Sequence, residues 1–466
     1  MVDELWITLD KFSGVDQSCH EYDLPTHASP SAQNMETEQG ILRTAKGYQK
    51  YYSDGLNATI YALENYYQRG ASGEETHYVI AATLDGLYAR SDDDTSWQEI
   101  TGNTGQDLYF STMDAINCSS GDQYIFLFTT DGQLMYYNGV STIYPVDSNF
   151  TTHMDSICLN AERVWGVGNL DNKERVWYSE ALNPLGWTSE NAGYIDIPSW
   201  KGNRNIAVRS YFNDVVVFKD NELYRVYGTY PGEFSVAKVH GECGALTPKT
   251  IVEYKDRVYF LNEEGICYYD GVRTGRLTDN KLREFFKTYN LSRTSISCAT
   301  VYKDKILFSI ATGTATRNNT IIEYDVPNQK YMIRTGIGAM CFLHYGEKLL
   351  FGSNDGYVYE YDKGEDYNGT PIEAYWETPA MDLGAKYAKK SSTTLYAHAC
   401  GTGKLKIQAK FGDRVKEKQV TLTQEMKLIK VRIPNTGRLV KLKFSNVEGS
   451  QFQIHAPQIL IEPDED

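Results

Sequence analysis

One phrase returns along most of this chain: an apolar strand, a tight turn of Asp, Asn or Glu with Gly, and a second strand rich in Tyr. Apolar residues alternate along each first strand and Tyr residues along each second strand, a pattern that predicts β-hairpins. Pairs such as Asp-Gly supply the positive φ that tight hairpin turns require. The clearest copies are YVIAATLDGLYARS at 78–91, YIFLFTTDGQLMYYNG at 124–139, DVVVFKDNELYRVYG at 214–228, RVYFLNEEGICYYDG at 257–271 and KLLFGSNDGYVYEYD at 348–362.

The spacing of these hairpins indicates the kind of repeat. Together with two weaker units at 162–180 and 304–325, the turn centres fall near positions 86, 132, 172, 221, 265, 315 and 356, an average of about 45 residues apart. A four-stranded propeller blade takes roughly 40 to 50 residues. Radial closure of such blades protects their sheet edges. The sequence therefore predicts an all-β fold, a β-propeller of about seven blades.

The two ends of the chain do not follow the repeat. Residues 370–466 contain about seven short alternating strands, which predicts a small antiparallel β-sandwich after a propeller at 53–369. Residues 1–52 have turn residues without steady alternation, and we expect an extended N-terminal arm or ring closure there. Three roles stay open for this arm: wrapping the ring, closing the last blade, or reaching a neighbouring subunit.

We expect one helix, at residues 279–290. Asp279 is a suitable N-cap. Four large apolar side chains share one face of the predicted helix and favour its packing on a blade or a partner: Leu282, Phe285, Phe286 and Tyr289.

Charge is distributed unevenly along the chain. The formal net charge is −15, yet residues 370–466 contain 15 Lys and Arg against 11 Asp and Glu, which leaves 31 against 50 in the remainder. We expect that the acidic part of the chain before residue 370 does not bind nucleic-acid phosphates over a broad surface, because such binding needs clustered cations. The last module instead has a positive face, which is either a solvated sheet or a subunit-docking surface. Its lysines are Lys386, Lys389, Lys390, Lys404, Lys406 and Lys410.

Local motifs give no reason to expect catalysis, a cofactor or a metal. The eight histidines form no H-x-H or H-x-x-x-H pair. The eight cysteines lie at least 24 residues apart, which is typical of buried, reduced residues in a protein made in a cytoplasm. Acids such as Asp85, Asp131 and Asp355 occupy hairpin turns, where backbone geometry explains them. A propeller can still gather distant residues at its axis, so local spacing does not exclude a site there.

The chain also lacks the sequence features of membrane insertion. No run of about 18 apolar residues occurs, and we expect no membrane anchor. The N-terminus MVDELWITLDKF has early acids and no signal-peptide order of basic then apolar residues.

Two short segments resemble a known family. Residues 34–48 read NMETEQGILRTAKGY, with the pattern N-x5-G-x-L-R-x3-G-Y before the repeats. Residues 437–454 contain GRLVKLKFS and QFQI in the terminal module. This layout resembles bacteriophage proteins described as tail hub or packaged-DNA stabilisation proteins, which are β-propeller virion components of short-tailed phages.

The resemblance implies a structural virion protein of a phage neck or tail, made in the host cytoplasm. Several copies would form a ring below the portal and adaptor, contact other tail proteins, and help to retain and conduct the genome without binding it specifically. An acidic wall fits that role because it repels phosphates. No catalytic residues come with the resemblance, so we expect no enzyme. The alternatives are a carbohydrate-binding or glycoside-cleaving propeller and a scaffold propeller that binds peptides.

Overall fold

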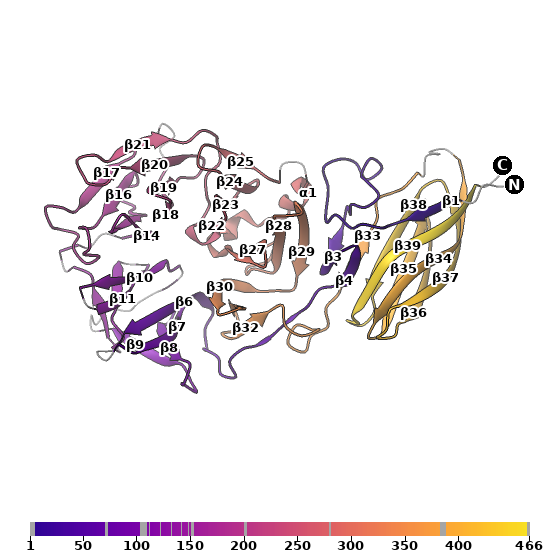
Figure 1. Cartoon of the computed structure of the whole chain (residues 1–466), viewed down its shortest axis with the longest axis horizontal. Helices are drawn as coiled ribbons and strands as arrows, with labels where there is room; N and C mark the ends of the chain where they lie inside the picture. Colours follow the sequence, from indigo (N-terminus) through magenta and orange to yellow (C-terminus); the bar gives the residue numbers. More distant parts are fainter. Residues whose placement is uncertain are drawn as a thin grey trace.

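The computed structural model has two modules along its long axis, a ring of sheets and a two-sheet sandwich (Figure 1). It describes residues 5–463 except 70–72, 103–109, 111, 122, 132, 141, 148, 151–152, 200–202, 279–280 and 383–387. Nearly all regular elements are strands, as the sequence predicts.

In the described residues the ring consists of seven four-stranded antiparallel blades, which confirms the predicted β-propeller. Blade 1 contains β6 (Ile60–Arg69), β7 (Glu75–Thr83), β8 (Leu87–Ser91) and β9 (Gln98–Gly102). Blade 2 contains β10 (Ala115–Ser120), β11 (Gln123–Thr129), β12 (Leu134–Tyr137) and β13 (Thr142–Pro145). Blade 3 contains β14 (Ser156–Asn160), β15 (Arg163–Val167), β16 (Arg175–Tyr178) and β17 (Gly193–Asp196). A short parallel pairing of β13 with β9 joins blades 1 and 2 into one eight-stranded sheet.

The remaining blades follow in chain order, apart from one strand. Blade 4 contains β18 (Ala207–Tyr211), β19 (Asp214–Phe218), β20 (Leu223–Tyr227) and β21 (Ser235–Lys238). Blade 5 contains β22 (Val252–Tyr254), β23 (Arg257–Asn262), β24 (Gly265–Tyr269) and β25 (Thr274–Arg276). Blade 6 contains β26 (Cys298–Tyr302), β27 (Lys305–Ile310), β28 (Thr320–Asp325) and β29 (Lys330–Thr335). Blade 7 contains β30 (Ala339–Tyr345), β31 (Lys348–Ser353), β32 (Val358–Tyr361) and the early strand β5 (Tyr48–Lys50).

Six of the seven predicted turn centres fall between the second and third strands of a blade, and the seventh, position 265, is the first residue of the third strand β24. The turn chemistry explains this regularity. Gly356, between β31 and β32, has φ +81°, and a Cβ there would overlap the carbonyl oxygen of Leu56. Only glycine combines that conformation with so close a backbone approach.

The second strand of each blade supplies apolar contacts to both neighbouring blades. In β7, Val79 and Ala81 pack toward blade 7, whereas Ile80 and Ala82 pack toward blade 2. Successive side chains of a strand point to opposite faces of its sheet, so one strand serves two cores. The contact between β6 and β30 closes the ring.

The N-terminal arm is divided between the two modules. β5 pairs with β32 and completes blade 7. Of the three roles left open for the arm, β5 therefore takes the closure of the last blade. The four strands before it belong to the sandwich: β1 (Leu5–Thr8), β2 (Ala32–Gln33), β3 (Met35–Glu38) and β4 (Ile41–Thr44).

The sandwich combines these strands with the C-terminal part of the chain. One sheet has the order β3-β4-β39-β34-β37, with β1 also paired to β39, and the other has the order β2-β33-β38-β35-β36. The C-terminal strands are β33 (Tyr375–Glu377), β34 (Lys390–Gly401), β35 (Lys404–Phe411), β36 (Arg414–Thr421), β37 (Lys427–Gly437), β38 (Val440–Asn446) and β39 (Phe452–Pro463).

The two modules share one apolar core at their junction. Trp376 of the sandwich lies edge to face with Phe12, and both belong to the same buried cluster as Phe308 of blade 6. The arm also bonds along the outer strand of that blade, where Asn34 N donates to the carbonyl oxygen of Ile333 at 2.9 Å. The arm thereby covers an exposed sheet edge.

The expected helix is shorter than predicted. α1 spans only Arg283–Phe286, and short 3-10 turns occur at η1 (Pro248–Thr250) and η2 (Leu291–Ile296). Asp279, the expected N-cap, lies outside the described residues. A single helical turn is marginal by itself, and the segment is held by burial of Leu282 and Tyr289 in the junction core.

Candidate functional site

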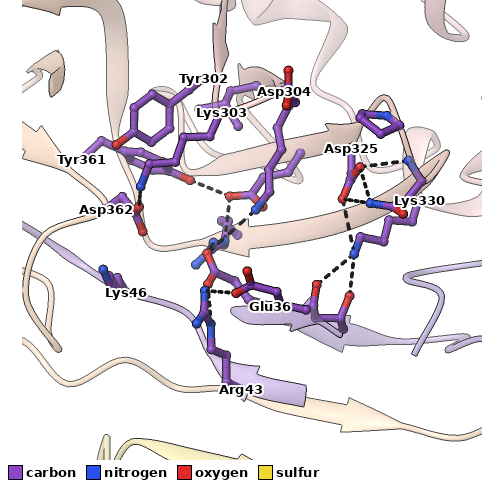
Figure 2. A pocket seen from close by; sticks show the side chains of 18 of the residues that line it. Glu36, Arg43, Lys46, Tyr302, Lys303, Asp304, Asp325, Lys330, Tyr361 and Asp362 are labelled. Carbon is purple, nitrogen blue, oxygen red and sulfur yellow. Dashed lines mark hydrogen bonds and ion pairs between the residues drawn. The ribbon is translucent and has the colours of Figure 1, made fainter. Parts of the chain in front are cut away.

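A cavity of about 700 Å³ opens where the arm crosses blades 6 and 7 (Figure 2). Its walls come from β3 and β4 of the sandwich, β27 to β29 of blade 6, and the end of β32 in blade 7. Six acidic and six basic side chains line it. This balance leaves no surplus charge of one sign with which to recruit an ionic ligand.

Arg334 is the centre of the buried wall of this cavity. Its Nε donates to Glu323 at 2.9 Å and its Nη2 to Glu36 at 2.5 Å. The side chains of Arg334 and Glu323 are each only 2% exposed. Arg334 lies on β29, Glu323 on β28 and Glu36 on β3, so one guanidinium bonds blade 6 to the sandwich.

Further donors complete the cluster. Lys305 Nζ donates to Glu323 at 3.1 Å, and the Tyr361 hydroxyl donates to the other oxygen of that carboxylate at 2.7 Å. Arg43 Nε donates to Glu36 at 2.9 Å. We call Glu36, Lys305, Glu323, Arg334 and Tyr361 the junction cluster. Its members come from β3, β27, β28, β29 and β32, so it ties two blades to the sandwich.

Both carboxylates of the junction cluster stay charged despite their burial. Burial alone would raise the pKa of Glu36, but Arg334, Lys305 and Arg43 outweigh it and lower that pKa to about 2. Arg334 and Lys305 likewise overcome burial and lower the pKa of Glu323. Glu323 in turn raises the pKa of Lys305. Paired buried charges of this kind fix geometry, since an unpaired partner would be costly.

A second polar cluster lies on the propeller axis, around a cavity of about 160 Å³. Arg209 of β18 donates to Asp114 at 2.7 Å, to Ser156 Oγ of β14 at 2.9 Å, and to the carbonyl oxygen of Pro248 at 2.8 Å. Lys249 Nζ donates to the carbonyl oxygen of Tyr61 at 2.9 Å, which joins the start of blade 5 to blade 1. These bonds tie five blades together across the axis.

Glu64 of β6 also faces this axial cavity. Burial, assisted by the Asp114 carboxylate, raises the pKa of Glu64 to about 8, although Arg209 and Lys249 act against the rise. The group is therefore protonated at neutral pH. The cavity has room for several water molecules and is far too small for a nucleic-acid duplex.

The predicted lysine face is only partly present. Lys389, Lys404 and Lys410 are exposed, and Lys406 pairs with Glu417 at 2.9 Å; Lys386 lies outside the described residues. Lys390 is not part of a positive face. It is 4% exposed, and its Nζ donates to the carbonyl oxygens of Ala388 and Arg438.

Lys390 is buried because a neighbouring strand lies on each side of it. It is the first residue of β34 and pairs with Gly437 on one side and Pro463 on the other. Burial lowers the pKa of its ammonium group. Lys390 is therefore a structural residue that satisfies two backbone carbonyls.

The residues of the junction cluster and of the axial cluster were not predicted from the sequence. Glu36 and Arg334 lie 298 residues apart, so no local motif unites them. The one available signal was a charge inside an apolar strand, as in YMIRT at 331–335. The axial residues come from different blades in the same way.

In the described part of the chain, no three His, Cys, Asp or Glu residues are grouped so that they could hold a metal ion. Among the same residues, no helix has both the length and the apolar character needed to cross a membrane.

Comparison with known proteins gives little beyond this. No family model and no curated protein matches the chain. Among solved structures, a catalytically inactive virginiamycin B lyase from Staphylococcus aureus with quinupristin has a TM-score of 0.44 and 12% identity, covering 67% of this chain and 98% of that one. The WD40 domain of Neurospora crassa Pan2 has a TM-score of 0.39 and 9% identity, covering 69% and 96%.

A computationally designed protein, Ika8, is similar at a TM-score of 0.41 and 11% identity, covering 67% of this chain and 99% of that one. Similarity at this level carries no argument about function. The propeller is assigned from its own strand pairing.

Proposed function

We propose that this chain is a structural virion protein of a phage neck or tail, a hub that forms a ring below the portal and adaptor and helps to retain and conduct the genome. In this proposal it has no catalytic step and no cofactor. Its partners are further copies of itself, the portal or adaptor, tail proteins, and genomic DNA that passes without specific binding.

The observation that carries the proposal is the way the two chain ends lock the modules together. The arm gives four strands to the sandwich and one to blade 7, and the junction cluster bonds the same arm to blade 6. Hinged enzymes and binding proteins move domains around a ligand. A chain with a shared core and buried ion pairs between its modules is instead built to keep one shape under load.

The two segments that resemble the phage family also meet in space. β4 lies within residues 34–48, and β39 begins within residues 437–454. The two strands pair directly, with Gln453 opposite Arg43 and Ile454 opposite Leu42. QFQI thus shares a sheet with β4, whereas GRLVKLKFS contributes β38 to the other sheet. That both segments belong to one sandwich supports reading them as one structural feature.

The axial cavity restricts how DNA is conducted in this proposal. A space of about 160 Å³ crossed by Arg209 and Lys249 cannot admit a duplex. The conduit is therefore the hole of a ring of copies, with acidic propeller surfaces as its wall. Such a wall repels phosphates and lets the genome slide.

The test is a cryo-EM reconstruction of particles from cells that produce this chain, combined with deletion of its gene. We expect density for the chain as a ring beneath the portal, and deletion particles that package DNA and then lose it. A location away from the conduit would contradict the proposal. Saturable binding on a glycan array, or polysaccharide hydrolysis by the purified chain, would favour the carbohydrate-directed alternative.

A further inference from the structure

Two edge strands lie side by side on one flank of the sandwich. β36 ends one sheet and β37 ends the other. A groove of about 660 Å³ runs along them. Val431 and Ile433 are buried beside it and Val420 is half-buried, so its floor is apolar.

The rims of this groove are basic. Lys416 and Lys418 form one rim, where Glu417 between them pairs with Lys406, and Lys430 and Arg432 form the other. All four are exposed, and within the described residues no carboxylate forms an ion pair with any of them. We call these four residues, with the floor between them, the edge groove.

The register of β36 makes the first two lysines unusual. Lys416 pairs with Ala409 and Lys418 with Ile407, and both partners are buried in the sandwich core. Directly paired residues share a face of a sheet, so these lysines are on the core-facing side yet remain in solvent. Inward-pointing lysines protect an edge strand from random pairing, but that alone does not explain the apolar surface beside them.

Two further apolar side chains are exposed on the same two strands, outside the lining of the groove. Leu428 of β37 is 62% exposed and Val415 of β36 is 51% exposed. Apolar residues rimmed by cations are typical of a protein interface. The missing element is a partner that brings negative charge.

The chain itself carries the complementary charge at its other end. Residues 370–466 have 15 basic and 11 acidic residues and the arm, residues 1–52, has 4 and 8, so together they are neutral, whereas the propeller at 53–369 has 27 and 42 and a net charge of −15. The propeller and the sandwich lie at opposite ends of the long axis (Figure 1). The basic groove of one copy is therefore attracted to the acidic propeller of another.

We infer that the edge groove docks on the acidic propeller of a second copy. This contact is heterologous, because a sandwich meets a propeller, so it builds a closed ring if the rotation closes and a filament if it does not. The inference rests on the proposed function in that it names the contact between neighbouring copies of the hub.

The test is sedimentation velocity of the full chain and two variants of equal charge. K416E/K418E reverses one rim of the groove, and K404E/K410E makes the same change on exposed positions of neighbouring β35. We expect the wild type and K404E/K410E to associate at about 50 mM salt and to dissociate at about 500 mM, where the Debye length is about 4 Å. K416E/K418E should bind at least about tenfold more weakly, with an unchanged circular dichroism spectrum.

A mixing experiment tests the direction of the contact. K416E/K418E keeps its acidic propeller, so a wild-type sandwich can still dock on it. An excess of this variant should cap wild-type assemblies and shorten them to dimers. Failure to cap, equal loss in both variants, or a wild type that stays monomeric would each overturn the inference.

Two further results separate this inference from the proposed function. Binding of a fluorescent 30-base-pair duplex that K416E/K418E abolishes would show that the groove is a nucleic-acid site and would overturn the inference. A monomeric chain found beneath the portal in particles would refute the docking surface and leave the proposed function standing. Self-assembly of a chain absent from the conduit would do the reverse.

Discussion

Replacement of Arg334 by methionine tests whether the junction cluster holds the two modules together. The change keeps an unbranched side chain but removes the cation that bonds both Glu323 and Glu36. Glu36 then keeps Arg43 at 2.9 Å, and both carboxylates share Lys305, which lies 3.1 Å from Glu323 and 3.8 Å from Glu36. Removing one partner of a buried ion pair costs about 3–5 kcal/mol, and we expect Arg334→Met to cost about 4 kcal/mol.

The size of the thermal shift reveals which part of the chain unfolds. An unfolding entropy of about 2.1 cal/mol/K per residue gives about 1 kcal/mol/K for all 466 residues. A loss of about 4 kcal/mol then lowers Tm by about 4 °C if the chain unfolds as one unit. If the sandwich with its arm, about 140 residues, unfolds first, the same loss shifts its transition by about 13 °C. Calorimetry separates the two cases.

The matched control removes an exposed arginine of the sandwich. Arg438→Met should change Tm by less than about 1 °C, because exposed substitutions away from special features cost little. The double variant Arg334→Met with Glu323→Leu should cost less than the sum of its single changes, since it leaves fewer buried charges unpaired. A loss below about 1 kcal/mol for Arg334→Met would refute the cluster as a lock.

Three further outcomes follow from the buried ionisable groups. The pKa of Glu36 falls from 4.5 to about 2 on folding. The stabilisation of the fold by ionised Glu36 is therefore complete above pH 4.5 and is lost as the pH falls toward 2. In urea unfolding, the free energy of unfolding should fall more steeply below pH 4.5 in the wild type than in Glu36→Gln. The pKa of Glu64 rises from 4.5 to about 8 on folding, so ionisation of Glu64 opposes folding increasingly as the pH rises from 4.5 to 8. Glu64→Gln should therefore raise Tm more at pH 8 than at pH 5. An equal rise in Tm at the two pH values would contradict this. Lys390→Glu buries a carboxylate beside two carbonyl oxygens and should cost about 2–4 kcal/mol in denaturant titration, whereas Lys410→Glu should stay within about 0.5 kcal/mol.

The propeller could be predicted because its turns carry their own chemistry. Each hairpin needs φ > 0 at a turn position and alternation in the flanking strands, and both are visible in a window of about 15 residues. Short strands lack this signal. β22 and β25 have three residues each, and β2 has two, so none of them shows an alternation. Their places are set by the sheets that they join.

The sites were harder to predict because their residues meet only after folding. Lys390 and Lys410 look alike in the sequence, but one is the start of a central strand and the other an exposed position of β35. The edge groove had a local signal that was missed. RVKEKQVT at 414–421 is a strand without apolar alternation, which is expected only for an edge.

The junction cluster and the edge groove make separable predictions about assembly. If the edge groove of one copy docks on the propeller of the next, the angle between the sandwich and its own propeller sets the rotation from copy to copy. Only one rotation closes a ring of a given size. Arg334→Met loosens that angle without touching the groove, so it should leave association intact and broaden the distribution of assembly sizes, whereas K416E/K418E should weaken association at least about tenfold. Mass photometry at about 50 mM salt distinguishes the two. A single unchanged assembly size in Arg334→Met would show that the shared core around Trp376, and not the ion pairs, fixes the angle.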